Sequence, residues 1–205
     1  MKFISIKNYY YSFYHNSKIL PFQLDNKKLD DLDLSDFDND LVPFVKQYFY
    51  LKSGIEHYRL LANISTYFNN KTLLDIGTFK GGSALALSYN KSNNVISIDI
   101  INNLESEINR DNIEFKLLNI LDYPEIIKES SLIVLDTAHD GTFEEELYNY
   151  LLSSNWNGII IADDIYLNKP MRKWWKTIDK KYKYDLTKYG HHSGTGLINL
   201  SSRNL

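Results

Sequence analysis

Acidic side chains end several short apolar runs of this sequence, and glycines follow the first of these runs. The stretch LLDIGTFKGGSALAL places Asp75 at the end of that run. Between it and an Ala/Leu-rich segment lie Gly77, Gly81 and Gly82. Glycine lets a backbone approach a ligand more closely than a Cβ would allow, and a helix beginning near Gly82 would offer free N–H groups. The stretch therefore predicts a ligand-binding turn between a strand and a helix.

The next apolar run, NVISIDI, carries Asp99, 24 residues beyond Asp75. A carboxylate at such a strand end can accept hydrogen bonds from both hydroxyls of a ribose. The turn itself reads D-x-G-x-x-x-G-G, whereas a dinucleotide site favours G-x-G-x-x-G. Asp75 would repel a phosphate but suits a cationic amino-acid group. A ligand with an ammonium group at one end and a ribose at the other is S-adenosylmethionine, and these residues predict a site for it.

Two later apolar runs end in further acidic residues. LIVLDTAHDG contains Asp136 and His139, and GIIIADDIY contains Asp163 and Asp164. If the two runs are adjacent strands, their ends converge, and carboxylates in one pocket repel one another unless a cation or protons intervene. A divalent ion with oxygen ligands, Mg²⁺ or Mn²⁺, resolves that repulsion. We therefore predict Asp136, Asp163 and Asp164 as metal ligands; the alternative is that the Asp-Asp pair caps the next turn and faces water.

Alternating strands and helices would bring these residues together. Helical patterns are found at 55–68, 81–90, 103–110, 123–130 and 143–154, and strand patterns at 72–77, 94–100, 113–120, 131–136 and 158–165. The strands are short and almost continuously apolar, which is typical of a parallel sheet covered on both faces. The pattern predicts a doubly wound, Rossmann-like α/β fold, in which ligands bind beyond the carboxyl ends of the strands.

Composition limits the class of protein. The length of 205 residues suits one full-sized domain, and the net charge of -3 shows no basic excess that would favour nucleic acid. The absence of cysteine excludes disulfides and thiolate metal sites. No apolar run approaches the ~20 residues of a membrane span, and the N-terminus is too polar for a signal peptide. We therefore expect a soluble, cytoplasmic protein without a membrane partner.

Over residues 55–200 the sequence resembles the class I S-adenosylmethionine-dependent methyltransferases. DIGTFKGGS is similar to their first motif and SIDI to their second. By that resemblance the glycine turn would hold the methionine part of the cofactor, the second strand end its ribose, and the third strand end would lie near adenine. The residues concerned are Asp75, Gly77, Gly81, Gly82 and Ser83 for methionine, Asp99 for ribose, and Asn119 and Asp122 near adenine. The resemblance also implies a closing antiparallel hairpin at 182–187 and 194–200.

The later strand ends are similar to those of metal-dependent O-methyltransferases of the catechol type. They are closer to the antibiotic and sugar O-methyltransferases of the macrocin type, in which an Asp-x-x-His strand end and a later Asp-Asp pair recur. The resemblance implies an enzyme that moves a methyl group from S-adenosylmethionine to a hydroxyl of a sugar or glycan, with Mg²⁺ or Mn²⁺. Because imidazole titrates nearest neutrality, His139 is the first candidate for the general base and His192 the second. The alternative for His139 is that it caps the following helix or forms hydrogen bonds within its loop. Glu56, His57 and Tyr58 lie just ahead of the first strand, where such enzymes often close over cofactor and substrate, and they are further candidates for contacts there.

Other assignments stay open. A catechol-type small-molecule methyltransferase, an RNA or cap methyltransferase and a non-catalytic subunit that binds S-adenosylmethionine are alternatives, the second favoured by the basic segment 169–188. Residues 1–54 combine an aromatic run (NYYYSFYH) with an acidic stretch at 25–40 and are predicted to be an extension with short helices. That extension is either a solvated loop packed down by tyrosines, or a substrate lid or homodimer contact. Residues 55–205 would form the methyltransferase domain.

Overall fold

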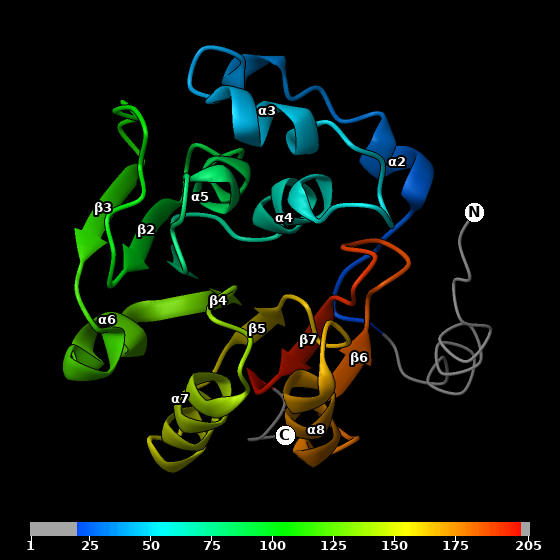
Figure 1. Ribbon diagram of the computed structural model, residues 1–205, viewed down its shortest axis with the longest axis vertical. Coiled ribbons are helices and arrows are strands. Elements are labelled where there is room, and N and C mark those ends of the chain that lie inside the picture. The colour runs from blue at the N-terminus through cyan, green and yellow to red at the C-terminus, as the bar shows by residue number, and fades with distance from the viewer. Residues whose placement is uncertain (1–19, 202–205) are drawn as a thin grey trace.

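Seven strands form one sheet in the described part of the chain, residues 20–201 of the computed structural model. Their order is β3-β2-β1-β4-β5-β7-β6 (Figure 1). The strands are β1 Thr72–Ile76, β2 Asn94–Asp99, β3 Ile113–Leu117, β4 Ser130–Leu135, β5 Ile159–Ala162, β6 Lys183–Asp185 and β7 Gly196–Asn199. Strands β1 to β5 are parallel, and β7 is antiparallel to both β5 and β6. The predicted doubly wound α/β fold, with a mostly parallel sheet and a C-terminal antiparallel hairpin, is confirmed.

Helices cover both faces of this sheet (Figure 1). On one face lie α4 Tyr58–Ser65 and α5 Gly82–Leu87, with α2 Asn26–Asp30 and α3 Pro43–Phe49 packed against the same core. On the other face lie α6 Pro124–Glu129, α7 Thr142–Ser153 and α8 Lys169–Thr177. Short 3-10 helices span Ser35–Phe37 and Ile120–Asp122. Strand order reverses between β1 and β4, which is where ligands bind in sheets of this kind. Within residues 20–201, no helix combines the length and apolar character needed to span a membrane.

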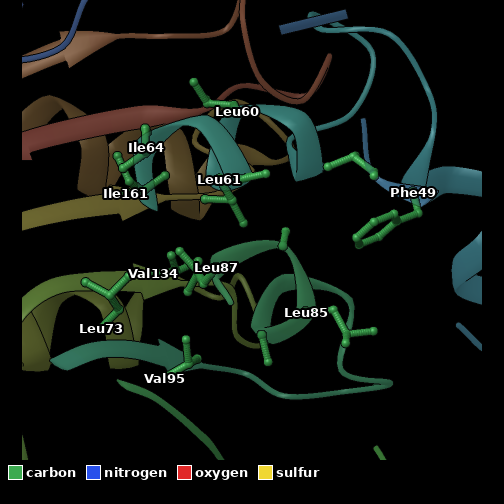
Figure 2. Close-up of a cluster of buried hydrophobic side chains, with 14 of the residues drawn as sticks. Phe49, Leu60, Leu61, Ile64, Leu73, Leu85, Leu87, Val95, Val134 and Ile161 are labelled. Carbon is green, nitrogen blue, oxygen red and sulfur yellow. The ribbon is translucent and has the colours of Figure 1, made fainter. Parts of the chain in front are cut away.

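Alternate residues of each central strand face opposite layers of helices. In β4, Val134 belongs to the core under α4 and α5, while Ile133 belongs to the core under α6, α7 and α8. Figure 2 shows the first of these cores, where Leu73, Val95, Val134 and Ile161 of the sheet lie near Leu60, Leu61 and Ile64 of α4 and Leu85 and Leu87 of α5. Because both faces are buried, the central strands are mostly apolar, and Asp75, Asp136 and Asp163 lie at or just after the ends of β1, β4 and β5.

The described part of the N-terminal extension, residues 20–54, belongs to the first core. Phe22, Leu29, Phe37 and Phe49 are among its residues buried there, and the rings of Phe37 and Phe49 lie 5.5 Å apart. Its acidic stretch has specific partners, since Arg110 forms ion pairs with Asp36 at 3.2 Å and with Asp40 at 2.6 Å. The short helices expected in this extension are present. The domain boundary at residue 54 stays a prediction, and the aromatic run at 8–15 lies outside the described residues.

The helix predicted at 103–110 is wrong, because this segment is an irregular loop. Its apolar residues Leu104 and Ile108 have helical spacing, but they cover Gly81 at the start of α5 instead. The side chain of Asn102 accepts a hydrogen bond from the backbone N–H of Leu104 at 3.2 Å, which fixes the turn at the start of the loop. The strand predicted at 113–120 is also shorter than expected: β3 ends at Leu117, before the second 3-10 helix.

Candidate active site

The turn after β1 is folded tightly against the end of β4. Gly77 has a φ of +104°, and a Cβ at this position would overlap the carbonyl oxygen of Asp136. Gly81 has a φ of +82° at the start of α5, and its Cβ would lie 2.5 Å from the Ile108 side chain. These glycines are therefore required by close contacts within the chain itself. The contact at Gly77 places the predicted cofactor turn directly beside the predicted metal ligand Asp136.

Asp75 is fully buried and only half satisfied. Its Oδ2 accepts a hydrogen bond of 2.7 Å from the hydroxyl of Ser97, which also lies 2.8 Å from the hydroxyl of Thr78. Its Oδ1 has no hydrogen-bond partner among residues 20–201. Burial raises the pKa of Asp75 to about 7, although the hydroxyls of Ser97 and Ser83 oppose the rise. An unpartnered buried carboxylate oxygen fits a cationic group, so the residues present suit the ammonium end of S-adenosylmethionine.

Ser97 was not among the predicted site residues. It is the residue of β2 paired with Asp75 of β1 in the parallel register, and it is fully buried. A serine in the middle of the apolar run NVISIDI is the signal that could have identified it, because a buried hydroxyl needs a hydrogen-bond partner.

Asp99 ends β2, and two backbone N–H groups hold its carboxylate. Phe79 N donates to Oδ2 at 3.0 Å and Ile101 N donates to Oδ1 at 3.1 Å. Phe79 adopts a φ of +44°, which is uncommon for an aromatic residue. Asn119 accepts a bond from Leu121 N at 3.2 Å and so caps the 3-10 helix that contains the exposed Asp122. The predicted ribose and adenine residues thus follow neighbouring strands, β2 and β3.

The three predicted metal ligands follow two adjacent strands. Asp136 comes directly after β4 and Asp163 directly after β5, and Asp163 N donates to Leu135 O at 2.9 Å. Successive strand residues point to opposite faces, but Asp164 has a φ of +56° beyond the end of β5. Because of this turn, Asp163 and Asp164 both reach one imidazole, that of His191, at 3.4 and 3.0 Å.

His139 and His192 have different surroundings. Nε2 of His139 lies 3.1 Å from Asp136 Oδ1 and 3.6 Å from Asp164 Oδ2, so this histidine is within the carboxylate cluster. His192 is held by the N-terminal side of α4, with its Nδ1 3.2 Å from Ile55 O. Of the two adjacent histidines, His191 and His192, it is His191 that contacts the carboxylates, and His191 was not predicted. The role of either predicted base stays a prediction.

A third histidine enters the cluster from the start of α4. Nδ1 of His57 lies 3.2 Å from Glu56 Oε1 and 3.3 Å from Asp163 Oδ1. The residue is 4% exposed, and within residues 20–201 neither ring nitrogen has a hydrogen-bond partner. There are three overlapping sets of side chains, and in each set the ligand atoms are close enough together to hold a metal ion. They are Glu56, His57 and His191; His57, Asp136 and Asp163; and Asp163, Asp164 and His191.

Burial and charge act in opposite directions on the pKa values of this cluster. Burial lowers the pKa of His57, but the nearby carboxylates, Asp163 foremost, together outweigh it and raise that pKa to about 10. Burial also lowers the pKa of His191, and Asp163, Asp164 and Glu56 together raise it to about 11. Burial raises the pKa of Asp136, whereas the two histidines hold the pKa of Asp163 well below its usual range despite burial. Protonated histidines therefore balance the carboxylates here, and a bound cation would displace those protons.

The basic segment near α8 lies beside the loop that carries His139. Lys169 and Lys173 line a surface cavity of about 340 Å³ together with Asp140 and Glu145, and none of the three predicted metal ligands lines it. The side chain of Asn168, which caps α8, donates to His139 O at 2.7 Å. The start of α8 therefore fixes the backbone of the His139 loop.

Comparison with known proteins shows the class of fold. The chain matches no protein-family model and no curated protein sequence. Among solved structures, it is similar to the SAH-bound methyltransferase PaMTH1 from Podospora anserina, with 14% identity, 97% of each chain covered and a TM-score of 0.52. It is similar to a candidate caffeoyl-CoA O-methyltransferase from Staphylococcus aureus, with 15% identity, 84% of this chain and 94% of that chain covered and a TM-score of 0.52. An O-methyltransferase from Bacillus cereus in complex with SAH has 15% identity, 92% and 95% coverage and a TM-score of 0.50.

Some matched structures are longer, and this chain spans about half of their length, 50% and 51% in two cases. At such low identities the likeness is one of fold. The protein therefore has the fold of the S-adenosylmethionine-dependent methyltransferases, O-methyltransferases among them.

Proposed function

We propose that the protein is an enzyme that transfers a methyl group from S-adenosylmethionine to a hydroxyl of a sugar or glycan with the help of a divalent metal ion. The observation that carries this proposal is the contact between Gly77 and the backbone of Asp136. It joins a turn suited to the methyl donor to a cluster of carboxylates and histidines suited to activating an acceptor. A methyltransferase needs both functions side by side, because methyl transfer requires the donor and the acceptor oxygen in line.

The donor would be held at its two polar ends. The unpartnered Oδ1 of Asp75 would accept a hydrogen bond from the ammonium group, with Gly77, Gly81, Gly82 and Ser83 around the methionine part. Asp99 would accept bonds from the ribose hydroxyls, because its carboxylate is already oriented by the N–H groups of Phe79 and Ile101. Asn119 and Asp122 would lie near the adenine.

The acceptor would be activated at the neighbouring cluster. Asp136, Asp163 and Asp164 would hold the metal ion, which when bound would lower the pKa of the acceptor hydroxyl. His139 would accept the proton at Nδ1, which is buried and has no partner among the described residues, while Nε2 faces Asp136. A positioned base of this kind contributes about 10²–10⁴-fold to the rate.

The acceptor class rests on the resemblance of the two strand ends to the macrocin-type enzymes. Exposed aromatic rings are found near Asp99: Phe79 is 49% exposed, and its ring lies 5.7 Å from that of the half-exposed Phe44. Such rings suit the apolar face of a sugar, and they equally suit a catechol ring.

The experiment is a screen for transfer of a radiolabelled methyl group from S-adenosylmethionine to monosaccharides, glycans, catechols and RNA. Transfer to a sugar hydroxyl supports the proposal. Transfer to a catechol or to RNA alone would replace the sugar by that acceptor. Binding of S-adenosylhomocysteine without transfer to any of the four classes would identify a non-catalytic subunit instead.

A further inference from the structure

Three residues are shared by the overlapping sets of potential metal ligands. His57, Asp163 and His191 each belong to two of the three sets, whereas Glu56, Asp136 and Asp164 each belong to one. The shared residues come from three distant parts of the chain: the start of α4, the end of β5 and the loop before β7. The centre of the cluster is therefore rich in nitrogen as well as in oxygen donors.

The carboxylate of Asp163 is divided between the two imidazoles. Its Oδ1 lies 3.3 Å from His57 Nδ1 and its Oδ2 lies 3.4 Å from His191 Nδ1. The hydroxyl of Thr195 also donates to Oδ1 at 3.5 Å, and it accepts a bond of 2.7 Å from the backbone N–H of His191. Thr195 therefore links the carboxylate to the loop that carries one of the imidazoles, as outer-shell groups do at metal sites.

His57 is the observation that points to a missing ligand. Its ring is buried and lies within 3.3 Å of two carboxylate oxygens, yet neither of its nitrogens makes a hydrogen bond to any part of the chain between residues 20 and 201. A buried polar group without a partner destabilises the folded state. Nδ1 forms ion pairs with these carboxylates when the ring is protonated, so a metal ion that displaces the proton would supply the partner that the neutral ring lacks.

We propose that His57 and His191 bind a metal ion together with Glu56, a set whose ligand atoms all lie within 4.8 Å of one another. The centre consequently takes a first-row transition ion such as Mn²⁺, Fe²⁺, Co²⁺ or Zn²⁺ in preference to Mg²⁺. Mg²⁺ is held by oxygen ligands and water, whereas imidazole suits the transition ions. The inference deepens the metal part of the proposed function, because both histidines also contact Asp163, but it makes no use of methyl transfer.

The test measures binding of Co²⁺ and Mg²⁺ to the full-length protein by calorimetry, with the visible absorption of bound Co²⁺ as a second readout of nitrogen ligation. The variants are His57→Ala and His191→Ala, and His192→Ala is the matched control because its ring bonds to Ile55 O instead. We expect each of the first two substitutions to lower Co²⁺ affinity by at least about 100-fold and to change the Co²⁺ spectrum. Mg²⁺ affinity should fall much less, and His192→Ala should bind both ions as the wild type does.

The outcomes separate this inference from the proposed function. If His57→Ala and His191→Ala bind Co²⁺ with wild-type affinity and spectrum, histidine ligation is wrong, although a metal-dependent transferase with carboxylate ligands would still stand. A wild-type protein that binds Mg²⁺ as tightly as Co²⁺ would also overturn the inference. Because His57 is buried, its substitution can disturb folding. In that case two measurements test the inference: the Co²⁺ affinity of His191→Ala, whose position is more exposed, and the ratio of the wild-type affinities for Co²⁺ and Mg²⁺.

Discussion

Nε2 of His139 lies 3.1 Å from Oδ1 of Asp136, the residue that directly follows β4. One ring nitrogen is thus oriented by a carboxylate, while Nδ1 is buried and has no partner among the described residues. That arrangement suits a general base, so we expect His139→Ala to lower the turnover number by at least about 10²-fold. The affinity for S-adenosylhomocysteine should barely change, which steady-state kinetics and calorimetry together can establish.

His192→Ala is the control for that substitution. Its ring contacts Ile55 O, so its removal should leave the turnover number near the wild-type value. If His192→Ala loses activity while His139→Ala retains it, the assignment of the base to His139 is wrong.

The buried carboxyl of Asp75 predicts a pH dependence of stability. Burial raises its pKa from 3.8 to about 7, so between these values the folded state keeps a proton that the unfolded state has lost. Stability therefore falls as the pH rises through this range, and the full cost is present above pH ~7. Asp75→Asn removes the charge, and we expect it to be more stable than the wild type at pH 8, by up to about 4 kcal/mol. The difference should shrink as the pH approaches 4.

Urea denaturation at several pH values measures this difference. A gap between wild type and Asp75→Asn that stays constant from pH 5 to pH 8 would show that Asp75 does not titrate in this range. The hydroxyl of Ser97 can donate to the amide oxygen of the variant, so its hydrogen bond is retained in the comparison.

Asp99 is expected to contribute to cofactor affinity through charge-assisted hydrogen bonds. Asp99→Ala should weaken S-adenosylhomocysteine binding by about 1.5–3 kcal/mol. Part of that loss would come from the N–H groups of Phe79 and Ile101, which donate to this carboxylate in the wild type and would lose their acceptor in the variant. Asp99→Asn keeps one acceptor oxygen, so its affinity for S-adenosylhomocysteine should lie between those of the wild type and Asp99→Ala. Calorimetry that finds unchanged affinity in a folded Asp99→Ala protein would remove the ribose assignment.

The two glycines of the β1 turn should differ in their tolerance of a methyl group. Gly81→Ala places its Cβ against the flexible end of Ile108 at a φ of +82°, and should cost roughly 1–3 kcal/mol of stability. Gly77→Ala places its Cβ on the backbone carbonyl of Asp136, which cannot move aside, and should cost about 4 kcal/mol or more. Thermal or urea unfolding compares the two, and a reversed order would contradict the close approach at Gly77.

The sheet and the acidic strand ends could be predicted because strands that are buried on both faces need apolar residues at most positions. The central strands are mostly apolar up to the carboxyl edge, near which Asp75, Asp99, Asp136 and Asp163 lie, and Ser97 within β2 is an exception. The loop at 103–110 could not be predicted, because its apolar residues have helical spacing but serve to cover Gly81.

The histidines of the cluster could be predicted only in part, because they come from segments that meet in space alone. His57 enters from α4 and His191 from the loop before β7, and both meet Asp163 after β5. Nothing in the adjacent pair His191 and His192 indicates which ring turns inward. That choice is made by Thr195, which bonds to the backbone N–H of His191, and by Ile55, whose carbonyl takes the His192 ring.

The most direct test of the account is the metal dependence of methyl transfer from S-adenosylmethionine. Excess EDTA should abolish transfer to the acceptor, and added Mn²⁺ should restore it. Asp163→Ala and Asp164→Ala should each lose activity in the presence of Mn²⁺, because both carboxylates face the same cluster. Full activity in EDTA, or wild-type activity in both variants, would contradict the account and leave the Asp-Asp pair as the cap of a turn.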